Sequence, residues 1–500
     1  MLFKTQPYAH QLAAFERSSE LESFALTMEQ GTGKSKVVID SVAHLYNLGR
    51  LTGLLIIAPN GVHRNWILKE IPKHLPDYVP YAASAWSSAA SKKEQLAHDA
   101  MMMSPHLRIF AVNVEAMHVP RVVKEVRLFL NAAQTMTVID ESTRIKSPSG
   151  VRTKNILALT PLSRYRRILT GTPVTQSPLD VFSQYSFLDP DLFGTRSFTV
   201  FRSRYAEMMD VSHPLVQHIM RTQQLRYAPA LIATDSLGHA IYKNLRELKS
   251  LTDPHTLRVL KKDCLDLPPK IYTRIPIEMH EAQAKAYADL KRRLKSGLIA
   301  TDTAGRPLTK LNSIMYLQRI LCGTLPGVMT EDGKDAQLLP PDKNPRVQAL
   351  LADLAETDEQ AIIWCRFTDD IRAVTDALAA AYGPAAVVQY FGETSKDDRV
   401  QAIDRFQDGS ARFFVGNPQA GGTGLTLTAA GQVHYYSNSF KLEDRLQSED
   451  RAHRIGQHKT VRYVDYEVEG TIDTKILQAL HEKKNVADVI TGDAFNEWLA

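Results

Sequence analysis

Residues Ser23–Ser35 read SFALTMEQGTGKS, a short apolar run that leads into a glycine-rich turn. Apolar residues then recur at roughly helical spacing from Val37 to Tyr46, and Gly49 stands where a helix would end. The pattern predicts a strand, a glycine loop and a helix. Backbone N–H groups of such a loop turn toward a phosphate group, and the helix N-terminus adds partial positive charge.

The GTGKS loop carries the side chains that a nucleotide phosphate needs. Lys34 would reach the β- and γ-phosphates, and the hydroxyl of Ser35 would hold Mg2+. The longer phosphate-loop pattern has Gly at the position of Met28, so the match is to the shorter form G-x-G-K-S. The alternative is a strand-to-helix turn that merely carries a surface lysine.

The composition is that of an ordinary soluble globular protein. The chain has 500 residues, 44% apolar and 23% charged, and its length exceeds a single domain of about 100 to 200 residues. A net charge of +5 permits binding to a phosphate backbone without establishing it. The three cysteines are far apart with no C-x-x-C pair, which disfavours a disulfide framework or structural zinc. No window approaches the ~20 apolar residues of a membrane span, so we expect no membrane association.

Short apolar runs alternate with helical stretches over residues 1–190, which predicts a doubly wound parallel α/β domain. In such sheets ligands bind beyond the carboxyl ends of the strands, where GTGKS, Asp140–Thr143 (DEST) and Thr170–Pro173 (TGTP) fall. The expected strands after the first are 54–58, 107–112, 136–140 and 167–172.

An acidic pair, Asp140 and Glu141, stands at the end of the expected strand 136–140. Asp140 suits Mg2+ binding, usually through water, and Glu141 would polarise the attacking water. The alternative is that both acids merely end a strand. Their position after the loop lysine, in the chain order of a nucleotide hydrolase, favours the catalytic interpretation.

The rest of the chain divides into an insertion, a second lobe and a tail. Residues 191–340 contain many lysines and arginines in an irregular, mainly helical pattern, which predicts a basic insertion and linker. Residues 341–485 repeat the alternation of strands and helices, and residues 486–500 form a C-terminal tail. The strands expected in the second lobe are 361–365, 387–391, 412–415, 433–437 and 461–466.

The second lobe has no lysine-bearing phosphate loop but contains QSEDRAHRIGQ at residues 447–457. Arg451 and Arg454 are three residues apart, so on one helix they would share a face and address one phosphate group. The alternative is an arginine pair on the surface. A phosphate loop with carboxylates in one lobe and paired arginines in another would suit an ATPase to which both lobes contribute.

Six motifs in this order, PYAHQ, GTGKS, DEST, LTGTP, QAGGTGLTL and QSEDRAHRIGQ, resemble those of the superfamily-two helicase-like ATPases. The ending EDRAHRIGQ and the stretch LDLPPKIYTRIPIEM resemble most the Swi/Snf-type branch of DNA translocases. The resemblance covers residues 5–480 and implies two RecA-like parallel-sheet lobes with a mainly helical insertion between them. DEST stands where the family commonly has DEAH or DEAD, and Phe440 lies near where many relatives have Trp.

The resemblance also implies roles for individual residues. Gln11 would recognise adenine, and Thr170 and Thr172 would relay between ATP and DNA. The residues implied to contact ATP are Gln11, Gly31, Thr32, Gly33, Lys34, Ser35 and Gln447, with Ser35 and Asp140 as Mg2+ ligands. Those implied to be catalytic are Lys34, Asp140, Glu141, and the arginine fingers Arg451 and Arg454. Those implied to lie along DNA are Asn113, Arg366, Gln419, Gly421, Gly422 and Thr423.

We therefore expect a monomeric, ATP- and Mg2+-dependent motor that moves on double-stranded DNA and remodels DNA or protein–DNA complexes. Two alternatives stay open: a strand-separating or branch-migrating helicase, and a nucleotide-gated DNA-binding module with little turnover. The expected location is the cytoplasm of a bacterial or phage-infected cell, or the nucleus in a eukaryote.

Overall fold

The computed structural model describes residues 3–174, 177–235, 240–264, 267–295, 310–329, 335–419 and 425–482. The chain divides into two compact units, Met1–Leu265 and Asp266–Ala500. The segment 191–340 is therefore shared between the two units. None of the helices in the described ranges is both long enough and apolar enough to cross a bilayer.

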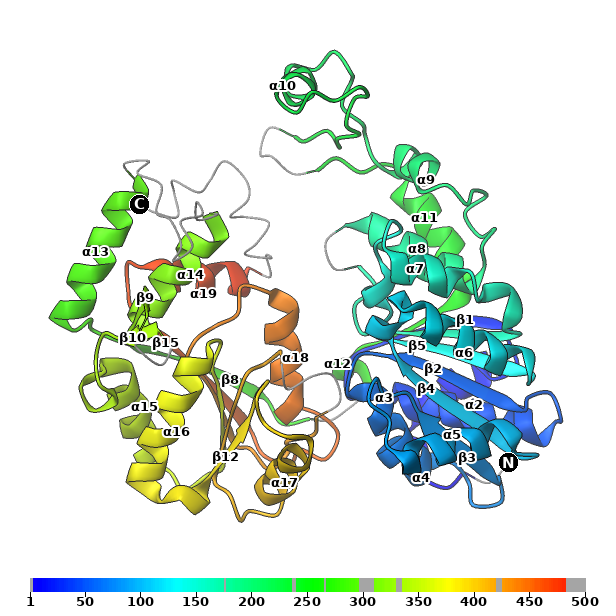
Figure 1. The fold of residues 1–500 in the computed structure, drawn as a ribbon, viewed down its shortest axis with the longest axis horizontal. Helices are drawn as coiled ribbons and strands as arrows, with labels where there is room; N and C mark the ends of the chain where they lie inside the picture. Colours follow the sequence, from blue (N-terminus) through cyan, green and yellow to red (C-terminus); the bar gives the residue numbers. More distant parts are fainter. Residues whose placement is uncertain are drawn as a thin grey trace. The chain divides into compact units, whose positions relative to one another are not determined.

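The first unit is built on a parallel sheet (Figure 1). Within the described residues this sheet has seven strands in the order β3-β4-β2-β5-β6-β1-β7, and every neighbouring pair is parallel. Parallel neighbours need crossover connections, so most strands are joined through helices. The strands are β1 (Ser23–Met28), β2 (Gly53–Ala58), β3 (Tyr81–Ala85), β4 (Leu107–Asn113), β5 (Thr135–Asp140), β6 (Tyr165–Leu169) and β7 (Thr256–Val259).

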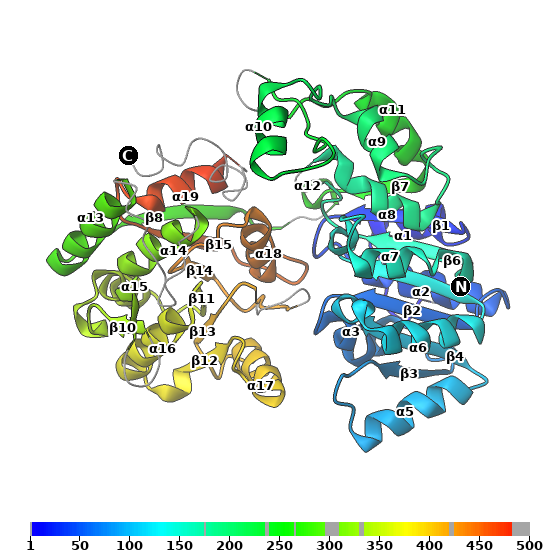
Figure 2. The ribbon, with the colours of Figure 1, turned by 45° about the horizontal axis from the view of Figure 1, so that its top comes forward.

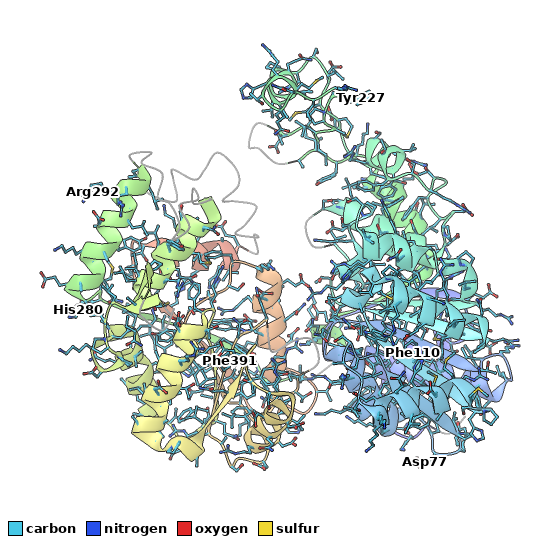
Figure 3. The ribbon with its side chains drawn as sticks, in the orientation of Figure 1. Asp77, Phe110, Tyr227, His280, Arg292 and Phe391 are labelled. Atoms are coloured by element: carbon cyan, nitrogen blue, oxygen red, sulfur yellow. The ribbon has the colours of Figure 1, made fainter. Side chains whose placement is uncertain are left out.

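Helices cover both faces of this sheet. Successive residues of a strand point to opposite faces, and in the central strands the side chains on both faces are apolar. Leu54 of β2 packs in a cluster with residues of α1 and α2. Its neighbour Leu55 packs in a second cluster with residues of α6 and α7, to which Phe110 also belongs (Figure 3). The helices are α1 (Ala9–Ser18), α2 (Lys34–Asn47), α3 (Val62–Asn65), α4 (Ile71–His74), α5 (Lys92–Met103), α6 (Pro120–Asn131), α7 (Val151–Leu157), α8 (Val181–Leu188), α9 (Phe198–Tyr205), α10 (Pro214–Thr222), α11 (Leu245–Thr252) and α12 (Lys261–Cys264).

The second unit contains a second parallel sheet, in which β12, β13, β11 and β14 lie side by side (Figure 2). Its order over the described residues is β12-β13-β11-β14-β15-β8. A separate antiparallel pair is formed by β9 (Thr324–Met329) and β10 (Asp335–Gln337). The strands of the sheet are β8 (Lys270–Pro276), β11 (Ala361–Trp364), β12 (Val387–Tyr390), β13 (Phe413–Gly416), β14 (Gln432–Tyr435) and β15 (Val461–Glu467).

Helices pack on both faces of the second sheet as well. Ile363 of β11 joins a cluster with residues of α14 to α16 and α19, whereas Ile362 joins one with residues of α17 and α18. The helices of this unit are α13 (Glu281–Lys295), α14 (Lys310–Leu321), α15 (Pro345–Ala355), α16 (Thr368–Tyr382), α17 (Lys396–Gln407), α18 (Leu442–Ala452) and α19 (Ile472–His481).

The expected architecture of two parallel-sheet α/β lobes is confirmed, and the strands expected from apolar runs are present with small shifts of their ends. Five further strands of the described residues, β3, β7, β8, β9 and β10, were not expected from the sequence. Four of them fall in the segment expected to be mainly helical: β7 extends the first sheet, β8 extends the second, and β9 and β10 form the separate antiparallel pair. The tail 486–500 lies outside the described residues.

Candidate functional site

The order of the first sheet brings three sequence motifs to one edge. Strands β5, β6 and β1 are neighbours, and their carboxyl ends lead into Asp140, Thr170 and the glycine loop. Parallel strands end at the same edge of a sheet, so these residues lie where ligands bind in open α/β sheets.

The glycine loop has the backbone geometry of a phosphate-binding turn. Gly31 and Gly33 have φ of 80° and 90°, a left-handed conformation that other residues rarely adopt. Helix α2 then begins at Lys34, and within this described stretch no side chain caps its N-terminus and no acid lies in its first turn. The helix dipole and the backbone N–H groups are therefore suited to an anion.

Lys34 lies across this loop rather than on the surface. Its Nζ donates to the carbonyl oxygens of Met28, at 2.8 Å, and Glu29, at 3.3 Å. The side chain of Met28 is fully buried in the core cluster behind the sheet. A glycine is not needed at position 28, because only the carbonyl group of this residue takes part in the loop.

Helix α1 supports the loop through Gln11, which is almost fully buried. Its Nε2 donates to the carbonyl oxygen of Thr32 at 3.0 Å, and Nε2 of His10 lies 2.8 Å from the same oxygen. The backbone N–H of Tyr8 donates to Oε1 of Gln11 at 3.1 Å. Gln11 therefore lies against the loop, and its recognition of adenine stays a prediction.

We expect Gly33→Ala to weaken ATP binding by on the order of tenfold or more, because position 33 combines two constraints. A Cβ built there lies 2.2 Å from Nε2 of Gln11, and φ is +90°. The matched control is Gly49→Ala, where φ is +66° and a Cβ meets nothing within 4 Å. Titration with a fluorescent ATP analogue measures the affinity of both variants. Equal affinities for Gly33→Ala and Gly49→Ala would show that the close approach of Gln11 to Gly33 does not shape the loop.

The carboxylates after β5 are buried and held in place. Oδ2 of Asp140 accepts a hydrogen bond from Nε1 of Trp66 at 2.9 Å, and Oδ1 accepts one from the backbone N–H of Glu141 at 3.0 Å. Burial raises the pKa of Asp140, against the opposing effects of the Trp66 bond and the positive charge of Lys34. Glu141 has φ of 51°, and its Oε1 accepts a bond from Nε2 of Gln30 at 3.2 Å.

These side chains fit Mg2+. Ser35, half-buried in the first turn of α2, supplies a hydroxyl and Asp140 supplies a carboxylate, and hard oxygen ligands are those that Mg2+ prefers. Burial raises the pKa of Asp140, and a cation bound beside the carboxylate would lower it again by stabilising the charged form.

The residues implied to couple ATP to DNA, Thr170 and Thr172, follow β6, and Asn113, implied to lie along DNA, ends β4. Thr170 is fully buried, and its Oγ1 accepts a hydrogen bond from the backbone N–H of Thr172 at 3.1 Å; Thr172 itself is exposed. Asn113 is half-buried at the end of β4, at the same sheet edge, with β2 between β4 and β5.

In the second unit, α18 is anchored to the sheet by a buried ionic network around Arg445. Nη2 of Arg445 donates to Oδ2 of Asp465 on β15 at 2.9 Å, and Nε donates to Oε1 of Glu449 at 2.9 Å. Lys270 of β8 donates to Glu449 Oε2, also at 2.9 Å. Paired and hydrogen-bonded in this way, the buried charges fix the position of α18.

The prediction that one helix face presents Arg451 and Arg454 is wrong. Arg451 is buried on α18, but the helix ends at Ala452, and Arg454 lies in the turn beyond it. The backbone N–H of Gln457 closes that turn on the carbonyl of Arg454 at 2.9 Å. Nη1 of Arg454 donates to the carbonyl of Leu425 at 3.0 Å. The two guanidinium groups therefore belong to different local structures.

Arg366 has a distinctive environment. Its guanidinium lies 3.6 Å from the ring centre of Phe440, and burial lowers its pKa to about 10. Nδ2 of Asn417 donates to the carbonyl of Arg366 at 2.7 Å. Phe440, in place of the expected Trp, still supplies an aromatic face for the cation.

The other predicted contacts of this unit are only partly described. Gln447 is half-buried and donates to Glu443 Oε1 at 2.9 Å, and the exposed Gln419 donates to Asp444 Oδ2 at 2.7 Å. Gly421, Gly422 and Thr423 lie outside the described residues.

Sequence reasoning assigned no role to Gln30, which contacts Glu141, or to Trp66, which contacts Asp140. These contacts join residues far apart in the sequence, and no local pattern marks them. Trp66 lies in a π-helical turn, η1 (Trp66–Glu70), between α3 and α4.

Two family models match the chain. The SNF2-related domain matches residues 14–324, and the helicase conserved C-terminal domain matches residues 342–456. This chain belongs to the SNF2-related family, and the helicase-like ATPase class that its motifs resemble is confirmed.

The similar proteins include much longer chains. Protein CHROMATIN REMODELING 4 of Arabidopsis thaliana is 25% identical, over 96% of this chain and 21% of the relative. The DNA annealing helicase and endonuclease ZRANB3 of Mus musculus is 25% identical, over 94% of this chain and 38% of the relative. This chain thus spans 21% to 38% of the length of these two curated relatives. The Sulfolobus solfataricus SWI2/SNF2 ATPase core in complex with dsDNA is 22% identical, with a TM-score of 0.41, over 100% of this chain and 96% of that one.

Proposed function

We propose that this chain is an ATP-hydrolysing motor that moves along double-stranded DNA, as a monomer, and remodels DNA or protein–DNA complexes without necessarily separating the strands. The observation that carries the proposal is the convergence of the glycine loop, the buried carboxylates and the Thr170 turn on three neighbouring strands. Membership of the SNF2-related family supports it, as do relatives named for chromatin remodelling and DNA annealing. Its cytoplasmic or nuclear location stays a prediction.

In this proposal the first unit binds and cleaves ATP. The loop from Gly31 to Ser35 holds the phosphates, with Lys34 released from the carbonyls of its own loop to contact them. Ser35 and Asp140 would hold Mg2+, which neutralises phosphate charge when bound. Glu141 orients the attacking water, while the bond from Gln30 keeps its carboxylate from rotating away.

The remaining site residues stabilise the charge of the reacting phosphoryl group, contact DNA or link these two events. Arg451 and Arg454 supply positive charge to the phosphoryl group as it is transferred. Asn113, Arg366 and Gln419 contact the phosphate backbone, which gives affinity without sequence preference. Thr170 and Thr172 link the two events, because Thr170 is buried beside the ATP loops and Thr172 is exposed.

The test is the ATPase rate with duplex DNA, single-stranded DNA, forked DNA and RNA. We expect duplex DNA to stimulate most, with stimulation falling as salt rises, because counterions compete for phosphate contacts. The negative control is Lys34→Met, which keeps a side chain of similar length but removes its charge. Any ATP turnover that remains with this variant does not come from the site at Lys34. Stronger stimulation by single strands or RNA would contradict the proposal.

Two further assays separate the alternatives. Displacement of a triplex-forming strand without unwinding of a forked duplex supports translocation, whereas unwinding supports a strand-separating helicase. No turnover with any nucleic acid, together with intact ATP binding, supports a nucleotide-gated DNA-binding module.

A further inference from the structure

A hydrogen-bond chain joins the carboxylate loop to the Thr170 turn through Gln184 of α8, and the side chains of Ser142 and Gln184 in it are fully buried. Oγ of Ser142, the residue after Glu141, donates to Oε1 of Gln184 at 2.6 Å. Nε2 of Gln184 donates in turn to the carbonyl oxygens of Pro173 at 2.7 Å and Asp180 at 2.8 Å.

The contacts fix which way the Gln184 amide faces. Carbonyl oxygens only accept hydrogen bonds, so the NH2 group must point to Pro173 and Asp180 and the oxygen must point to Ser142. Burying an amide is costly unless its groups are paired, and here both ends are. The side chain therefore holds its two neighbouring loops in one relative position.

The same loops are also connected on the side of the glycine loop. Nε2 of Gln30 donates to Oε1 of Glu141 at 3.2 Å, and a Cβ built on Gly171 lies 3.4 Å from the backbone nitrogen of Gln30. Glu141 adjoins Ser142, and Gly171 precedes Pro173 by two residues. The glycine loop, the carboxylate loop and the Thr170 turn thus lie close together, and Gln184 supplies the polar connection between the last two.

We infer that Gln184 is a positioning residue that transmits movement of the Thr170 turn to Glu141, with the Ser142 hydroxyl as the intermediate contact. The inference rests on the proposed function, since it concerns how DNA binding changes ATP turnover. It gives Ser142, which stands where the family commonly has Ala, a role: a hydroxyl there has a buried acceptor on α8.

The experiment compares Gln184→Met and Ser142→Ala with the wild type in duplex-stimulated ATPase, with kcat and KM for ATP measured separately. We expect both variants to lose on the order of tenfold in the stimulation of kcat by duplex DNA, with KM for ATP within about twofold. The matched control is Ser186→Ala, another buried polar residue of α8, whose Oγ has no hydrogen-bond partner among the described residues. We expect it to keep the wild-type stimulation.

Thermal unfolding of each variant separates positioning from simple stability. A lower Tm with full stimulation, measured well below each Tm, would overturn the inference. Should Gln184→Met fail to fold, Ser142→Ala decides alone, because it deletes a single oxygen atom. Absence of duplex stimulation in the wild type itself would instead show that the proposed function has failed, and the inference with it.

Discussion

Replacing Glu141 by Gln is expected to lower ATP turnover by about 10² to 10⁴-fold while ATP binding persists. The carboxylate is held by Gln30 directly after β5, and glutamine keeps its length and the acceptor oxygen for that bond. An amide cannot act as a base toward the attacking water. The expected loss is therefore in kcat, with little change in the Kd for ATP.

Steady-state ATPase rates with duplex DNA and equilibrium titration with an ATP analogue measure the two quantities. Glu22→Gln is the matched control, since Glu22 is an exposed carboxylate before β1 whose oxygen lies 3.4 Å from Arg164. Surface pairs of this kind contribute little, so this variant should behave as wild type. Turnover that survives Glu141→Gln would assign water orientation to another group.

Arg454→Ala is expected to lower kcat by about 10³-fold, the lower end of the effect of arginine fingers in nucleotide hydrolases. A guanidinium stabilises charge that develops during phosphoryl transfer, and its planar fork is not reproduced by lysine. Arg454→Lys should therefore restore little of the rate. Since Arg451 is buried on α18 and Arg454 lies in the following turn, the two arginines should differ in effect, with the smaller loss for Arg451→Ala.

The matched control for these arginines is Arg405→Ala. Arg405 belongs to the same unit and, like Arg454, donates from a terminal nitrogen to a backbone carbonyl, that of Ala385. Steady-state kinetics should show a near wild-type kcat for this variant. Full activity of Arg454→Ala, with a loss for Arg451→Ala, would assign the finger to Arg451.

The central strands could be predicted from the sequence because they are buried on both faces. β2 (GLLIIA) and β5 (TMTVID) are buried at every position; the first is a continuous apolar run, and the second carries Met136, Val138 and Ile139 before Asp140. Of the strands that the sequence did not predict, β3 and β7 end the first sheet, β8 ends the second, and β9 and β10 form a separate two-stranded sheet. β8 (KIYTRIP) has no fully buried position, so its sequence carries little apolar signal.

The candidate site could be predicted where function depends on a local pattern. The GTGKS loop and the Asp-Glu pair combine a fixed order of residue types with the end of an apolar strand. The contact of Trp66 with Asp140 and that of Gln184 with Ser142 join residues 74 and 42 positions apart. Such pairs form only when helices pack on the sheet in a particular way. That packing is determined by many core residues together, so no short sequence pattern reveals it.

The path of the chain out of the first unit has a mechanical consequence. β7 is the last strand of that unit and an edge strand beside β1, and the backbone N–H of Lys261 just beyond it donates to Oε2 of Glu29 at 2.7 Å. The second unit begins at Asp266. The chain that leads to the second unit is therefore hydrogen-bonded to the residue that follows β1, so a pull along it would act on β7 and on the start of the glycine loop.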